Sequence, residues 1–81
     1  MKFNWSDSAR SDLRAIDREA AMRILLGLTE FVQTGQGDLK ALSGQWQGYF
    51  RLRIGDYRVI MAITPDEITV ARVRHRSEVY R

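Results

Sequence analysis

The sequence predicts a single α+β domain over residues 1–81, with two N-terminal helices packed on one face of a small antiparallel sheet. Two observations lead to this fold class. Apolar residues recur at helical spacing in the first half of the chain and alternate with polar residues after residue 48. Turn signals containing glycine or proline separate the alternating runs. The expected order of elements is therefore β-α-α-β-β-β, ending in an antiparallel meander.

A short strand and a short helix are expected first. Lys2–Trp5 alternates weakly, as a first strand would. Ser6 or Asp7 then offers an N-cap, and apolar residues recur at helical spacing from Ala9 onward. We therefore expect the first helix to cover about residues 7–15.

The second helix carries the clearest amphipathic pattern. Asp17 can cap its start, and Gly35 can end it in the left-handed conformation that glycine adopts at C-caps. Its expected buried stripe consists of Ala21, Ile24, Leu25, Leu28 and Val32. Met22 and Leu26 lie off this stripe. They either pack against the first helix, which is the more frequent arrangement, or form an exposed patch for a partner.

The C-terminal half follows the two-residue period of strands. We expect, in order, a connector over 36–48, strands over 49–54 and 57–63 joined by a hairpin turn at Gly55-Asp56, a turn over 64–67, a strand over 68–73 and a polar tail over 75–81. Pro65 suits the first corner of its turn.

The positive charge is concentrated near the C-terminus. Residues 1–50 carry six basic and six acidic groups, whereas residues 51–81 carry seven arginines and four acidic residues, which accounts for the whole net charge of +3. Arginine favours planar, bidentate recognition of phosphate and keeps its charge when partly desolvated. The pattern indicates a surface for a polyanion such as RNA, and a merely solubilising surface is the alternative.

Strand alternation gathers part of this charge on one sheet face. Arg51 and Arg53 alternate with apolar core residues, and Arg58 points the same way across the expected hairpin. We therefore expect all three side chains to face solvent. Like charges on neighbouring strands repel, so this face is predicted to meet an anion. The alternative is a solvated rim in which nearby acidic residues pair with the arginines.

The tail adds a histidine and a tyrosine to the arginines. His75 is the only histidine and has four arginines nearby in sequence, where positive charge favours its neutral, proton-accepting form. Tyr80 is suited to stack on a base or to take part in proton transfer. Its alternative role is to pack the C-terminus onto the sheet.

Composition excludes several classes of function. With no cysteine and one histidine, we expect no disulfide, no redox role, no metal site and no cofactor. The absence of a convincing carboxylate cluster argues against a two-metal nuclease. No apolar run approaches the roughly 20 residues of a membrane span, and the N-terminus lacks the pattern of a signal peptide. A cytoplasmic protein without membrane contact is therefore expected.

Three segments resemble a known family. They read LSG at 42–44, YFRLRIGDYRVI at 49–60 and VRHRSEVYR at 73–81. Together with the chain length and the β-α-α-β-β-β order, they resemble the RelE branch of the RelE/ParE toxin superfamily over the whole chain. The composite pattern is quite specific, whereas GDYR alone would be a weak signal.

This resemblance implies a toxin of a type II toxin–antitoxin pair. Such toxins cleave mRNA, typically in the ribosomal A site, and so inhibit translation. In the family mechanism the nucleotide 2′-hydroxyl attacks the adjacent phosphate and a 5′-hydroxyl is released. Phosphoryl transfer of this kind depends mainly on positioning and charge stabilisation, so a metal-independent endoribonuclease is chemically sensible.

The resemblance also assigns roles to residues. Catalytic roles fall on Arg51, Arg53, Arg58, Arg76, Tyr80 and His75. Further contacts with RNA are expected from Arg72, Arg74, Arg81 and Tyr49. Because Arg74 stands where many relatives have glycine, the tail arginine at the scissile phosphate is either Arg74 or Arg76.

One departure from the family bears on the general base. The paired strand positions are often lysine in the family, but here both are arginine, which essentially cannot carry a proton. Arg51 and Arg53 are therefore expected to act as electrostatic clamps. The base is expected in the tail, as His75 or Tyr80.

Two alternatives share this fold. The ParE branch of the superfamily blocks DNA gyrase and cleaves no RNA, and a general RNA-binding module would hold phosphate without a proton-transfer partner. The arginine set with Tyr80 favours the ribonuclease branch. A toxin also implies a cognate antitoxin, expected to be a small, helix-rich, RelB-like protein that wraps the domain and covers the helices and some of the arginine face. Met22 and Leu26 are its candidate contacts.

Overall fold

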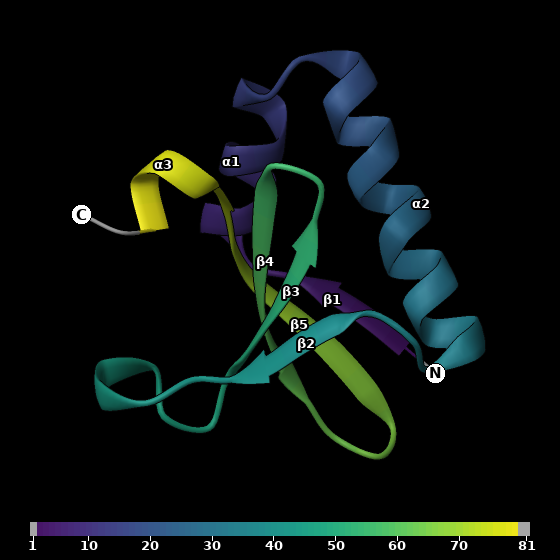
Figure 1. Ribbon diagram of the computed structural model, residues 1–81, viewed down its shortest axis with the longest axis vertical. Coiled ribbons are helices and arrows are strands. Elements are labelled where there is room, and N and C mark those ends of the chain that lie inside the picture. Colours follow the sequence, from purple (N-terminus) through teal and green to yellow (C-terminus); the bar gives the residue numbers. More distant parts are fainter. Residues whose placement is uncertain (1, 80–81) are drawn as a thin grey trace.

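The computed structural model describes the backbone of residues 2–79 and the side chains of residues 2–77 (Figure 1). The elements, in order, are β1 (Lys2–Trp5), α1 (Asp7–Ala15), α2 (Arg18–Thr34), β2 (Asp38–Ala41), the short 3-10 helix η1 (Gly44–Trp46), β3 (Phe50–Ile54), β4 (Tyr57–Ile63), β5 (Glu67–His75) and α3 (Arg76–Val79). The predicted α+β class and its element order are confirmed. Within the described residues, no helix is long and apolar enough to cross a membrane.

The strands form one five-stranded sheet in the order β1-β5-β4-β3-β2. β2 through β5 pair antiparallel, but β1 runs parallel to β5, so the sheet is mixed rather than wholly antiparallel. Parallel neighbours require a long crossover connection. The two helices and the meander between β1 and β5 together supply that connection.

Strand β2 lies inside the segment expected to be a connector. Its four residues, Asp38–Ala41, are all exposed and pair with β3 along the sheet edge. The sequence Asp-Leu-Lys-Ala has none of the β-branched or aromatic residues that favour strands. Backbone pairing with β3 holds it extended, and that contact is not visible in local sequence.

Both helix boundaries follow the predicted caps. The Ser6 side chain accepts a hydrogen bond from the Ala9 N–H at 3.0 Å, and that of Asp17 accepts from the Ala20 N–H at 3.1 Å. Gly35 ends α2 with φ of 71°, a value that favours glycine because other side chains are strained there.

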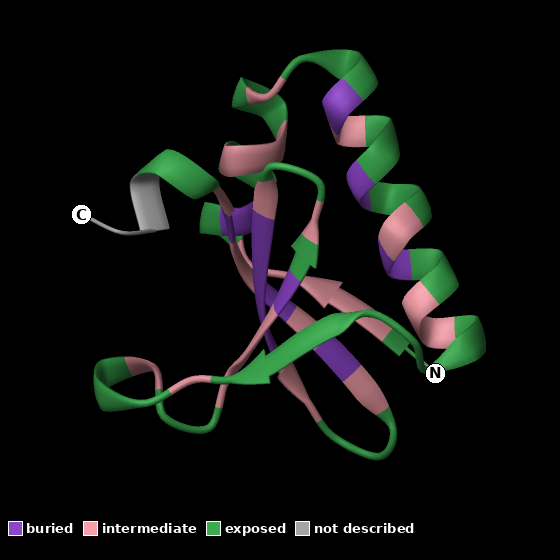
Figure 2. Ribbon diagram, in the orientation of Figure 1, coloured by how far each residue is buried: buried purple, intermediate pink, exposed green. Residues whose placement is uncertain are grey.

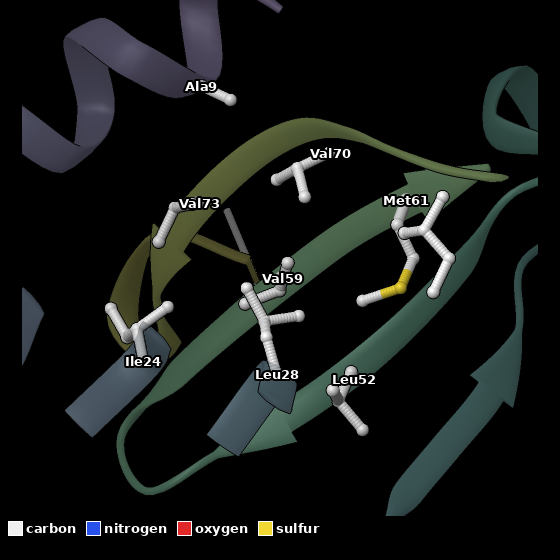
Figure 3. Packing of buried hydrophobic residues seen from close by; sticks show 9 residues of the cluster. Ala9, Ile24, Leu28, Leu52, Val59, Met61, Val70 and Val73 are labelled. Carbon is white, nitrogen blue, oxygen red and sulfur yellow. The ribbon is translucent and has the colours of Figure 1, made fainter. Parts of the chain in front are cut away.

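Both helices bury one stripe against the same sheet face. Figure 3 shows their side chains meeting those of the central strands. The buried cluster consists of Ala9, Ile24, Leu28, Leu52, Val59, Met61, Ile68, Val70 and Val73. Leu25, predicted to be buried, is 38% exposed, because the stripe facing the sheet is centred on Ile24 and Leu25 lies about 100° around the helix.

A bulge in β5 anchors α1. The β4–β5 register shifts between Ile60 and Met61, which leaves an extra residue at Ala71. Ser6 binds both sides of this irregularity: its N–H donates to the Val70 carbonyl at 2.9 Å and its hydroxyl donates to the Ala71 carbonyl at 2.7 Å. The start of α1 is thereby fixed to the middle of β5.

Candidate phosphate-binding site

Three arginines form one row across the sheet face that the long helices leave uncovered. Arg53 of β3 pairs with Arg58 of β4, and Arg58 pairs with Arg74 of β5. Cross-strand partners point to the same side of a sheet. The alternating core residues point toward the helices, so this row lies on the opposite face. We call Arg53, Arg58 and Arg74 the arginine row.

Arg58 is buried, and the prediction that it faces solvent is wrong. Only 4% of its surface is exposed, and a long stretch of β4 is coloured as buried in Figure 2. One terminal guanidinium nitrogen donates to the Gly55 carbonyl at 3.3 Å and to the Tyr57 carbonyl at 3.2 Å. The Nε is buried without a hydrogen-bond partner in the described structure. The side chain therefore folds back along its own hairpin instead of extending into water.

The arginine row lacks compensating negative charge at its centre. Among the residues that the structure describes, no carboxylate pairs with Arg58. Burying a charge is costly unless a counter-charge and hydrogen bonds accompany it, and like charges on neighbouring strands add repulsion. A bound anion would relieve both costs. The arrangement is thus suited to phosphate.

Arg51 stands one row further along the same face. Its side chain is 16% exposed, and its Nη2 contacts Oδ1 of Asp38 on β2 at 3.3 Å. Its Nε is also buried without a partner. Ile60 is the cross-strand neighbour of Arg51 and is buried on this face, where long arginine stems can cover apolar surface.

Arg72 binds Asp12 of α1 and does not extend the arginine row. Its Nε and Nη2 donate to the two carboxylate oxygens of Asp12, each at 2.9 Å, and the Val73 N–H donates to the same carboxylate at 2.9 Å. Burial tends to raise the pKa of Asp12. The hydrogen bonds from Arg72 and Val73 and the charges of Arg72 and Arg74 outweigh it, so this pKa is lowered from its usual value. In this structure Arg72 forms an ion pair with Asp12, and its contact with RNA stays a prediction.

His75 faces the helices, away from the arginine row. It pairs with Tyr57, and the two rings meet edge to face with centroids 5.3 Å apart. Its Nδ1 accepts from the Ser77 N–H at 3.2 Å and lies 2.9 Å from the Ser77 hydroxyl. Arg74 and His75 are neighbours in sequence, but strand alternation sends them to opposite faces. The structure thus separates His75 from the arginine row, and its role in proton transfer stays a prediction.

The ring of His75 lines a cavity of about 380 Å³ with Tyr57 and the loop between α1 and α2. Two carboxylates, Asp12 and Asp17, also line this cavity. Within the described part of the chain, no three histidine, cysteine or acidic side chains gather as a metal site.

The other predicted site residues are scattered. Arg76 is exposed at the start of α3, where its N–H donates to the Asp56 carbonyl of the β3–β4 turn at 2.7 Å. Tyr49 packs edge to face against Trp46, with ring centroids 5.2 Å apart. Tyr80 and Arg81 lie outside the described residues.

Two carboxylates that contact arginines were not predicted from the sequence. Asp12 holds Arg72, and Asp38 reaches Arg51. Both contacts join segments that are distant or unassigned in sequence, so no spacing pattern revealed them. The alternation of Asp38 and Lys40 around Leu39 was the one local signal for the edge strand that carries Asp38.

Comparison with known proteins supports one family. A family model described as "ParE toxin of type II toxin-antitoxin system, parDE" matches residues 3–80. The curated protein Toxin RelE3 of Methanocaldococcus jannaschii is 28% identical over 85 residues, covering 99% of this chain and 96% of the relative.

Solved structures agree with this match. The chain is similar to one in a RelB–RelE antitoxin–toxin complex from Methanococcus jannaschii, with a TM-score of 0.73, 26% identity and coverage of 95% of this chain and 94% of that one. A chain in the toxin–antitoxin complex RelBE2 from Mycobacterium tuberculosis has a TM-score of 0.79 at 22% identity, covering 93% of this chain and 96% of that one, and supports the fold alone.

Proposed function

The chain belongs to the family of ParE toxins of type II toxin–antitoxin systems, and from this premise we propose that it is a metal-independent endoribonuclease that cleaves mRNA in the ribosomal A site. The observation that carries this proposal is Arg58, a buried guanidinium without a carboxylate partner among the described residues, flanked by Arg53 and Arg74. Such a row stabilises the charge that develops on a scissile phosphate. Cleavage of mRNA would stop translation in the cytoplasm.

Each arginine has a distinct part in the proposed reaction. Arg58 is held in place at the bottom of the site, where its guanidinium attracts a non-bridging phosphate oxygen. Arg53 is exposed and closes on the phosphate from β3, while Arg74 does so from β5. Arg51 supports the neighbouring part of the RNA backbone. Because the guanidinium of Arg58 is already desolvated, little reorganisation is needed when charge develops in the transition state.

Residues outside the row have supporting parts. We assign Arg76, Arg81 and Tyr49 to the RNA backbone around the site, and Tyr80 to stacking on a base. His75, with its ring against Tyr57, is assigned to positioning the end of the β3–β4 hairpin. Arg72 is assigned to the ion pair with Asp12. The tail arginine that acts on the scissile phosphate is then Arg74, because it shares the arginine row with Arg58.

A cognate antitoxin is the expected partner, as in the RelB–RelE complex that the chain resembles. The outward side of α2 exposes Met22 at 52% and Leu26 at 60%. Beside it, a groove of about 350 Å³ is lined by Trp5, Arg10, Leu13, Arg14 and Leu25. We propose that a small, helix-rich, RelB-like antitoxin covers this apolar surface and pairs acidic residues with its basic rim.

Inhibition of DNA gyrase is the second candidate function. The observation that favours it is the family model itself, whose description names ParE. A gyrase inhibitor acts by binding and would have no use for a phosphate site with a buried guanidinium. The arginine row therefore favours the ribonuclease.

One experiment separates the two candidates. The chain is induced without its antitoxin, and mRNA 5′ ends are mapped by primer extension while gyrase–DNA breaks are measured in the same cells. A ribonuclease gives new 5′ ends within translated codons, and these disappear when ribosomes are removed from the message. Intact mRNA with accumulating gyrase breaks would instead establish the gyrase inhibitor and contradict the proposed function.

A further inference from the structure

The structure brings a carboxylate to the arginine face that the sequence pattern did not reveal. Strand β2 pairs Asp38 with Arg53, so Asp38 extends the arginine row by one strand. We infer that Asp38 is the general base of the cleavage reaction. This inference rests on the proposed ribonuclease function and adds to it the group that takes the proton.

The position of Asp38 suits this role. Its carboxylate Oδ1 contacts Arg51 Nη2 at 3.3 Å, while its side chain remains 56% exposed. Asp38 and Arg58 flank Arg53 on either side, so their backbones are separated by two strand spacings, about 10 Å. A phosphate held over Arg53 and Arg58 therefore places its attached ribose within reach of Asp38.

Among the side chains that the structure describes, the other proton acceptors near this face have other contacts or positions. Arginine does not release a proton in proteins. Within the described residues, Glu67 shares the sheet face but binds Asn4 at the other end of β5. Asp56 lines a cavity between the hairpin turn and α2, and His75 faces the helices. Asp12, whose pKa Arg74 also lowers, is occupied by Arg72 and Val73. Asp38 is an exposed carboxylate that continues the arginine row.

Three basic residues surround Asp38. Arg51 and Arg53 face it from β3, and Lys40 follows on its own strand, opposite Arg51. A carboxylate oxygen can act as a general base toward a hydroxyl group within hydrogen-bond reach. The contact with Arg51 holds one oxygen and leaves the other to meet a substrate hydroxyl.

The proposed step balances as follows. Asp38 takes the proton of the 2′-hydroxyl while the 2′ oxygen forms a bond to phosphorus. The bond from phosphorus to the 5′ oxygen breaks, and the 5′ oxygen leaves with the electron pair and takes a proton from water. The hydroxide left by that water removes the proton from Asp38. The products are a 2′,3′-cyclic phosphate and a 5′-hydroxyl.

The test compares purified wild-type protein with Asp38→Asn and Asp38→Glu in single-turnover cleavage of mRNA on programmed ribosomes. Asp66→Asn is the matched control, because Asp66 is an exposed carboxylate in the turn before β5. Binding is measured separately with a message carrying a 2′-deoxy nucleotide at the cleavage position, which cannot react. Thermal unfolding confirms that each variant is folded.

We expect Asp38→Asn to slow cleavage at least about 100-fold, as loss of a general base does, while binding of the 2′-deoxy message is kept. Between pH 6 and 8 the wild-type rate should be nearly flat. The Asn variant should gain roughly tenfold per pH unit, because hydroxide must then remove the proton. Asp38→Glu should recover part of the rate, and Asp66→Asn should match wild type.

Two results would overturn the assignment. Cleavage by Asp38→Asn at the wild-type rate or faster, with an unchanged pH profile, would show that Asp38 only competes with phosphate for Arg51. Weaker binding that accounts for the whole loss of rate would make Asp38 a binding residue. Failure of the wild-type protein to cleave any message would instead contradict the ribonuclease function itself, and the assignment with it.

Discussion

At the scale of single residues, Arg58 is a buried charge whose energetic cost the proposed function explains. Its guanidinium is desolvated, its Nε has no partner in the described structure, and arginines stand on both sides of it in the sheet. A residue selected for stability alone would be apolar at this position, because replacing buried ions by well-packed apolar residues is often neutral or stabilising. Under the proposed function, the chain trades stability for readiness to bind an anion.

This trade predicts that Arg58→Met raises or preserves the unfolding temperature while it removes activity. Methionine keeps much of the volume and needs no counter-charge. Cleavage should fall by about 100-fold or more, the loss typical of a missing oxyanion donor. Calorimetry and single-turnover cleavage measure the two effects.

The control is Arg18→Met, which removes an exposed arginine at the start of α2 and should leave cleavage unchanged. A large drop in the unfolding temperature of Arg58→Met would assign Arg58 to the stability of the fold instead of the site.

At the scale of elements, the bulge in β5 decides how α1 and the sheet fit together. β1 pairs with β5 only as far as Val70, and beyond that point backbone groups of β5 are bound by Ser6, the N-cap of α1, and by Asp12 within it. The same Asp12 carboxylate also binds Arg72 with two hydrogen bonds. One short helix therefore covers the core through Ala9. Through Asp12 it also accepts a hydrogen bond from the backbone of β5.

The contacts of Asp12 with Arg72 and Val73 predict a pH-dependent contribution to the stability of the fold. Because the folded pKa of Asp12 is lowered, its stabilisation is fully present above the unfolded value of about 3.9 and is lost as pH falls through the folded value. Asp12→Asn should lower the free energy of unfolding by about 2 kcal/mol at pH 7. Urea unfolding at pH 7 and near pH 2 measures this difference.

The gap between wild type and Asp12→Asn should shrink at the acidic end, since protonation removes the same charge that the substitution removes. A gap that stays constant with pH would mean that the carboxylate charge does not contribute. Asp7→Asn is the control, because Asp7 is exposed in the first turn of the same helix.

For the whole molecule, the two sides of the sheet carry different chemistry. One side is covered by α1 and α2, and the outer side of α2 exposes Met22, Leu25 and Leu26. The other side carries the arginine row and Asp38. The surface proposed for the antitoxin is therefore distinct from the one proposed for RNA, and a change in one should leave the other intact.

This separation predicts that Leu26→Asp weakens antitoxin binding without loss of cleavage. Leu26 is 60% exposed, so the substitution should cost the free toxin little stability. In complex with an acidic antitoxin, the new carboxylate loses apolar contact and adds repulsion, which should weaken binding at least tenfold. Titration calorimetry against the cognate antitoxin measures it.

Ser8→Asp adds the same charge to an exposed position of α1 and serves as the control. Unchanged antitoxin affinity in Leu26→Asp would place the interface elsewhere on the molecule. Loss of cleavage in the same variant would contradict the separation of the two surfaces.

Local patterns predicted the helices and the hairpin because their signals lie within a few residues. The caps at Ser6, Asp17 and Gly35 and the turn at Gly55 depend on backbone groups close in sequence, and each was confirmed. The side of the sheet on which Arg51, Arg53 and Arg58 lie also followed from alternation. The roles of these residues in catalysis stay predictions.

By itself, the sequence determined the fold class, the family resemblance and the collection of arginines on three adjacent strands, because periodicity and turn chemistry are local properties. Only the tertiary structure decided which arginines are available. In the folded chain Arg58 is buried and Arg72 forms an ion pair with Asp12. His75 packs against Tyr57 on the side of the helices, and β2 brings Asp38 to the edge of the sheet. Burial and ion pairing depend on which distant segments meet, and that meeting is fixed by the packed core rather than by neighbours in sequence.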